Sequence, residues 1–120
     1  DGVRTFGALL AHVAGASYEF CAAAKGEKSP HSEDEFEKSA KTKADIVKAL
    51  DGAIAYCDDV YKTLDDAKVA QVVPGAFGGP ASARAASLIG NTTHFQEHYG
   101  NIVTYLRING LVPPSSAPQK

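Results

Sequence analysis

Residues 4–25 read RTFGALLAHVAGASYEFCAAAK, and this alanine-rich stretch without proline decides the fold class. Its apolar residues recur at helical spacing, which predicts one long amphipathic helix over residues 4–25. Lys25 and Gly26 form a stop signal, because a cation favours the negative end of the helix dipole and glycine readily adopts the left-handed conformation. The sequence EKSPHS, residues 27–32, then predicts a loop.

A second helix is predicted from Ser32 to about residue 66. Ser32 and Glu35 have the spacing of a capping box, and an apolar stripe continues from Phe36 to Leu64. The many Lys, Glu and Asp residues of this segment alternate in sign, which is typical of a solvated outer face. This helix is therefore expected to carry little chemistry.

The remaining chain predicts a crossover, a third helix and a tail. Residues 67–80 are rich in glycine and proline, so no helix can run through them, and the short segment near Val72 is the longest candidate strand. A third helix is predicted over 82–109, because Gly110 and the prolines behind it form a stop signal. The fold class is thus all-α. The tail, residues 111–120, is expected to be ordered only where Leu111 and Val112 fold back.

Composition limits the classes of function. A chain of 120 residues is expected to form one domain, residues 1–120, and 12 basic against 14 acidic residues leave no field that would attract nucleic acid. No apolar run approaches the roughly 20 residues that span a bilayer, so a membrane protein is not expected. The sequence has no methionine and opens at Asp1, which predicts an incomplete N-terminus and leaves export open.

The two cysteines, Cys21 and Cys57, are predicted to be buried, inert thiols. If the first two helices formed an antiparallel hairpin about Pro30, the cysteines would lie roughly 28 Å apart at 1.5 Å of rise per residue. A disulfide could not form within such a hairpin. Both residues lie on apolar stripes, where free cysteine behaves as a small hydrophobe.

Two histidines, His94 and His98, lie four residues apart on the third predicted helix. A helical projection places both on one flank of its apolar stripe, where side chains of two helices can converge. Imidazoles at this spacing can bind one metal ion, but the Glu of the HExxH signature is absent. The pair alone is compatible with a metal site and with two ordinary polar positions.

His12 lies on the corresponding flank of the first helix. Its neighbours one turn away, Ala8, Gly15 and Ala16, have almost no side chain, so the imidazole can border a cavity. A histidine hydrogen-bonded at a helix interface is the alternative. As a third ligand, His12 would complete a site with open positions, the arrangement of catalytic rather than structural zinc.

The segments RTFGALLAHVAGASYEFC and HFQEHYGNIVTYLRINGLVPPSS, residues 4–21 and 94–116, closely resemble the DinB-like superfamily of bacterial four-helix bundles. The resemblance implies a metal site made by one histidine of an early helix and an HxxxH pair of the last. The matching residues here are His12, His94 and His98. It also implies a bacterial protein, with the cytoplasm favoured.

The family fold begins with a helix that precedes this segment, so only three of its long helices are present. The groove left between them is an apolar surface of the kind that soluble monomers avoid. A truncated or cleaved N-terminus, an exchanged helix, or a homodimer would account for it. A homodimer is the expected state.

The resemblance extends to function. Members include metal-dependent enzymes that use low-molecular-weight thiols, which implies a thiol S-transferase, an isomerase or a hydrolase acting on a small molecule. Ligation by nitrogen alone favours zinc or nickel as the divalent metal. Tyr105, Asn91 and Glu97 are candidates for orienting substrate or ligands at the catalytic site, with Tyr105 first because it shares the flank of His98. The alternative is a non-catalytic helical bundle that acts as a binding or stress-associated module.

Overall fold

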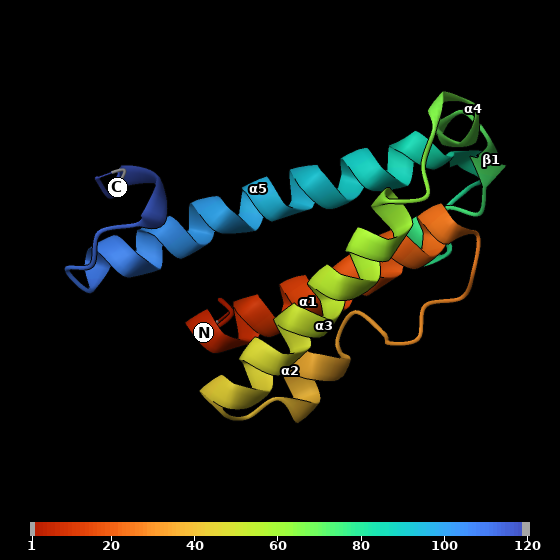
Figure 1. The fold of residues 1–120 in the computed structure, drawn as a ribbon. Helices are drawn as coiled ribbons and strands as arrows, with labels where there is room; N and C mark the ends of the chain where they lie inside the picture. Colours follow the sequence, from red (N-terminus) through yellow and green to blue (C-terminus); the bar gives the residue numbers. More distant parts are fainter. Residues whose placement is uncertain (1, 119–120) are drawn as a thin grey trace.

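The computed structural model describes residues 2–118, and three long helices account for most of them (Figure 1). The all-α prediction is confirmed, as are the predicted first and third helices to within two residues at each end. The elements in chain order are α1 (Phe6–Lys25), α2 (Glu35–Ser39), α3 (Lys43–Tyr61), α4 (Asp66–Val69), β1 (Val72–Val73), the 3-10 turn η1 (Ala76–Gly78), β2 (Ser82–Ala83), α5 (Arg84–Ile108) and the 3-10 turn η2 (Pro114–Ser116). The two short strands pair antiparallel within the crossover.

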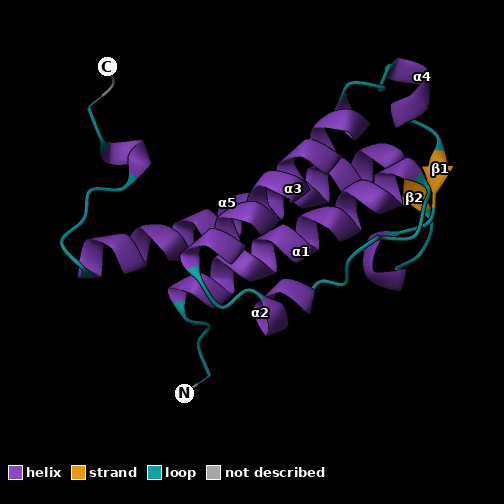
Figure 2. Ribbon diagram, turned by 60° about the horizontal axis from the view of Figure 1, so that its bottom comes forward, coloured by secondary structure: helices purple, strands orange, loops and turns teal. Residues whose placement is uncertain are grey.

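Helix α1 is the central element, because both α3 and α5 pack against it (Figure 2). The hydroxyl of Thr5 accepts a hydrogen bond from the N–H of Ala8 and caps its start, and Gly26 ends it in the left-handed conformation with φ of 80°. Most of its residues are buried, and many of these are alanine. Small side chains let two neighbouring helices approach one helix closely.

The predicted second helix is interrupted, and the expectation of one helix from Ser32 to about residue 66 is wrong. The chain leaves helical geometry after Ser39 and starts again at Lys43, where Thr42 and Asp45 form a complete capping box. The predicted box at Ser32 does not cap a helix, because α2 begins with Asp34 as its N-cap and lacks a side-chain cap. The break at 40–42 lets α2 and α3 pack separately.

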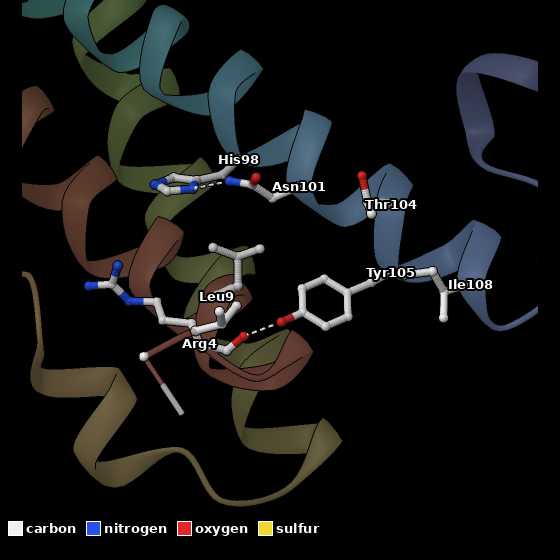
Figure 3. Close-up of a pocket in the computed structure, with 9 residues that line it drawn as sticks. Arg4, Leu9, His98, Asn101, Thr104, Tyr105 and Ile108 are labelled. Carbon is white, nitrogen blue, oxygen red and sulfur yellow. Dashed lines mark hydrogen bonds between the residues drawn. The ribbon is translucent and has the colours of Figure 1, made fainter.

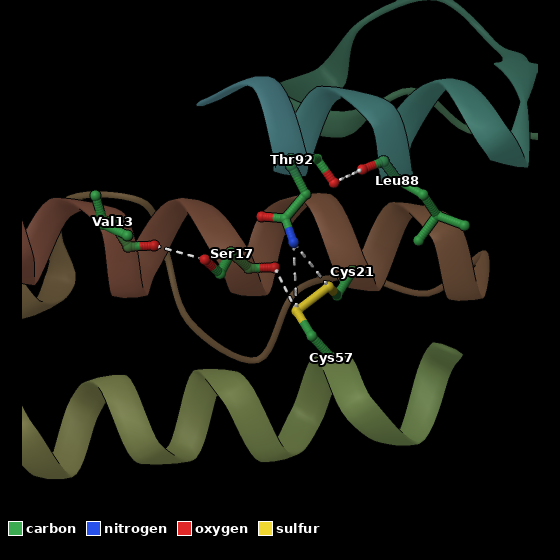
Figure 4. Close-up of a disulfide and its surroundings, with 7 residues drawn as sticks. Val13, Ser17, Cys21, Cys57, Leu88 and Thr92 are labelled. Carbon is green, nitrogen blue, oxygen red and sulfur yellow. Dashed lines mark hydrogen bonds between the residues drawn. A yellow bond between two sulfur atoms is a disulfide. The ribbon is translucent and has the colours of Figure 1, made fainter. Parts of the chain in front are cut away.

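Cys21 and Cys57 form a disulfide with their Cα atoms 5.4 Å apart (Figure 4), so the prediction of two free thiols is wrong. That prediction assumed an antiparallel hairpin. Instead residues 26–42 return along α1 before α3 begins, and α1 and α3 run parallel. Gly7 lies against Ile46 near the start of both helices, and the disulfide joins the same two helices further along.

Helices α3 and α5 share few direct contacts, which leaves a groove along α1 between them. A shallow cavity in this groove is lined by three large residues that are 52%, 41% and 37% exposed, namely Ile54, Tyr61 and Phe95. The groove agrees with the expectation for three helices of a four-helix family. The homodimer that would cover it stays a prediction.

The tail packs differently from the prediction. Leu111 and Val112 are exposed, whereas Pro113 is buried and the backbone N–H of Ser115 donates to the hydroxyl of Tyr99 over 2.9 Å. Pro113 and this hydrogen bond therefore hold the turn η2 against α5. Within residues 2–118, no helix combines the length and apolar character that crossing a bilayer requires.

Candidate metal centre

Three histidines from two helices meet near the middle of the bundle. Helix α1 supplies His12, and α5, which runs antiparallel to it, supplies His94 and His98. His12 is 3% and His98 8% exposed, and His94 is half-buried. One ligand nitrogen from each lies within 4.8 Å of the others, and no other group of three potential ligands of this kind occurs in residues 2–118.

The distances fit a shared ion. The Nε2 atom of His94 lies 3.1 Å from Nε2 of His12 and 2.9 Å from Nε2 of His98. Two nitrogens that each lie 2.0–2.1 Å from one tetrahedral ion are roughly 3.3 Å apart. The three imidazoles therefore need only small movements to hold one divalent metal ion together.

The surroundings keep the imidazoles of His12 and His94 neutral, as ligation requires. Burial lowers the pKa of His12, with a further contribution from the nearby Arg4 guanidinium. Burial and the neighbouring His98 and His12 lower the pKa of His94 to about 4. At neutral pH both rings hold an unprotonated nitrogen that can bind a metal ion.

The metal-free protein should lose stability as the pH falls from neutral. The pKa of His94 is about 4 in the folded chain, below the value of about 6.5 for an unfolded histidine. The unfolded state binds more protons between these two pKa values. The free energy of unfolding is therefore highest above about pH 6.5 and declines as the pH falls towards 4. Urea unfolding with a chelator at several pH values measures this, and His94→Asn should flatten the dependence. Identical pH profiles for both proteins would contradict it.

A cavity of about 470 Å³ opens beside the centre, between the start of α1 and the C-terminal half of α5 (Figure 3). His98 and Asn101 form its inner wall, and the Asn101 amide lies 3.3 Å from Nδ1 of His98. Leu9 and Ile108 make its sides apolar. A small molecule in this cavity would lie next to the metal ligands.

A comparison of the sequence with known families identifies the family of this chain. The sequence profile of the DinB superfamily matches residues 1–102, which include His12, His94 and His98. The chain belongs to the DinB superfamily. No curated protein and no solved structure matches it. The resemblance in the sequence is thereby confirmed, while no relative names a substrate for this DinB-superfamily chain.

The three predicted orienting residues of this DinB-superfamily chain occupy different surroundings. Tyr105 lines the cavity, and its hydroxyl donates a hydrogen bond to the backbone carbonyl of Arg4 (Figure 3). Asn91 is buried beside the disulfide, its amide 3.7 Å from the sulfur of Cys21, and Glu97 is exposed on α5. Of the three predicted orienting residues, only Tyr105 therefore lines the cavity beside His98.

Sequence reasoning missed two carboxylates and one amide of this centre. Glu33 and Glu37 lie beside His12, although the sequence pattern assigned their acidic run to a solvated face. Asn101 contacts His98 from the same face of α5. The i, i+3 spacing of His98 and Asn101 could have suggested the amide. Nothing local in the sequence connects the two carboxylates with His12.

Proposed function

We propose that this chain binds one divalent metal ion, zinc or nickel, through His12, His94 and His98 and acts as a metal-dependent enzyme on a small molecule. One observation carries the proposal. At the edge of a cavity, Nε2 of His94 lies 3.1 Å from Nε2 of His12 and 2.9 Å from Nε2 of His98. Three protein nitrogens leave coordination positions open, which is the arrangement of catalytic zinc.

The expected reactions are transfer of a low-molecular-weight thiol to an electrophile and hydrolysis. A divalent ion at the three histidines would favour the deprotonated form of a thiol or water beside it. Residues that line the cavity would bind and orient the substrate. Leu9 and Ile108 would bind the apolar part of a substrate, and the amide of Asn101 and the hydroxyl of Tyr105 supply the polar groups that orient it.

The test is thiol transfer by the tag-free protein with zinc, using a low-molecular-weight thiol and a chloro-dinitrobenzene. The thiolate sulfur forms a bond to the ring carbon as chloride leaves, which changes the absorbance. We expect the zinc-loaded protein to accelerate the reaction and His98→Ala to return it to the uncatalysed rate. Zinc binding without acceleration of thiol transfer or of ester hydrolysis would contradict the enzyme and favour the non-catalytic binding module.

A further inference from the structure

The two ring nitrogens of His12 have different surroundings. Nε2 points towards the other histidines, 3.1 Å from Nε2 of His94. Nδ1 is buried and has no hydrogen-bond partner, and the whole residue is 3% exposed. Buried polar atoms in proteins are nearly always hydrogen-bonded, so this nitrogen calls for a partner.

Two carboxylates face this nitrogen. The nearest oxygen of Glu37 lies 3.3 Å from Nδ1 of His12, and the nearest oxygen of Glu33 lies 3.4 Å from it. Both distances are slightly longer than an ordinary hydrogen bond between nitrogen and oxygen. A small shift of either side chain would close the contact.

The backbone is arranged so that the carboxylates reach this position. Gly15, three residues after His12, lies directly beneath Glu33, and a Cβ atom at Gly15 would be only 2.1 Å from the Glu33 carbonyl oxygen. The absence of a side chain at Gly15 lets the returning segment lie directly on α1. Helix α2 follows and brings Glu37 to the same place.

Glu37 is the better held of the two carboxylates. Nε of Arg4 lies within hydrogen-bonding distance of both its oxygens, at 3.2 and 3.1 Å. The side chain of Glu37 is 21% exposed, against 44% for Glu33. A fixed and less solvated carboxylate is the stronger acceptor for a buried ring N–H.

We propose that Glu37, assisted by Glu33, is a positioning residue that accepts a hydrogen bond from Nδ1–H of His12 and so directs the unprotonated Nε2 towards the metal ion. The proposal rests on the metal site proposed above. A carboxylate on the second nitrogen of a metal-binding histidine fixes the tautomer and ring orientation and makes the ligand more basic. Arg4, which precedes α1, in turn holds the carboxylate of Glu37 on α2, so both residues help to orient His12.

The test uses the full chain without a tag and two measurements. The first is zinc affinity by competition with a chromophoric chelator, where Glu37→Gln should weaken binding roughly 10- to 100-fold, the usual effect of losing such a partner. The second is the tautomer of His12 in the metal-free protein, read from long-range proton–nitrogen NMR correlations. We expect Nδ1–H in the wild type and a shift of population towards Nε2–H in Glu37→Gln.

Glu35→Gln is the matched control, because it makes the same chemical change on the same helix at a carboxylate that contacts His31 instead. It should leave both the affinity and the His12 tautomer unchanged. Unchanged affinity and tautomer in Glu37→Gln and in the double variant Glu33→Gln/Glu37→Gln would overturn the inference while leaving the metal site intact. A wild type that binds no zinc would instead overturn the metal site, and the inference with it.

Discussion

Replacing His94 by alanine should lower zinc affinity by more than the roughly 10- to 100-fold that follows from losing an outer partner of a ligand. His94 is the middle one of the three histidines, because its Nε2 lies close to Nε2 of both His12 and His98. Its loss leaves two nitrogens on different helices, which hold an ion far less well than three. Chelator competition measures the affinity, and circular dichroism checks that the helices remain.

The fourth histidine provides the matched control for this prediction. His31 is half-buried like His94, but it is not one of the three histidines that lie together. Its Nδ1 lies 2.8 Å from a carboxylate oxygen of Glu35. His31→Ala should therefore keep the zinc affinity of the wild type. Equal losses in His94→Ala and His31→Ala would mean that zinc binds unspecifically to surface histidines.

Breaking the disulfide should have the largest effect on stability. Cys21 and Cys57 are separated by 36 residues and join α1 to α3. Their bond restricts the unfolded chain, and the loss of such a link costs about 2 to 4 kcal/mol of the free energy of unfolding. Urea unfolding of Cys57→Ala against the oxidised wild type measures the difference, and a thiol reagent should detect no free cysteine in the wild type.

A double-mutant cycle separates the bond from simple side-chain loss. Either single substitution, Cys21→Ala or Cys57→Ala, already removes the bond, so the double variant should be little less stable than each single one. If the two cysteines were free thiols, the two losses would add. Additive losses, or two reactive thiols in the unreduced native protein, would contradict the disulfide.

The first and last helices could be predicted because their signals are local. Gly26 with a φ of 80° and Gly110 with a φ of 71° end α1 and α5 where the sequence placed the stop signals. The i, i+4 spacing of His94 and His98 likewise puts both imidazoles on one face whatever surrounds the helix. These features depend on a few neighbouring residues, so they are the same however the helices pack against one another.

The path of residues 26–42 could not be predicted, and most errors follow from it. Ser32 and Glu35 match the capping-box pattern as well as Thr42 and Asp45 do, and only the second pair caps a long helix. Once the break at 40–42 is missed, α3 is expected to run antiparallel to α1. The disulfide is then excluded by distance, although the two cysteines lie side by side in the fold.

The carboxylates beside His12 were missed for the same reason. In the sequence, Glu33 and Glu37 belong to an acidic run at the start of a helix, where such residues usually face solvent. Their approach to His12 depends on contact between segments that are far apart in the chain. This contact is possible because Gly15 has no side chain. An isolated glycine in a helix does not reveal which segment will lie on it.

The most direct test of the metal centre is native mass spectrometry of the tag-free chain after zinc loading and removal of excess metal. The proposed site predicts one ion per chain in the wild type, one in His31→Ala, and almost none in His98→Ala. A wild type that retains no zinc, or a His98→Ala variant that retains as much as the wild type, would contradict it.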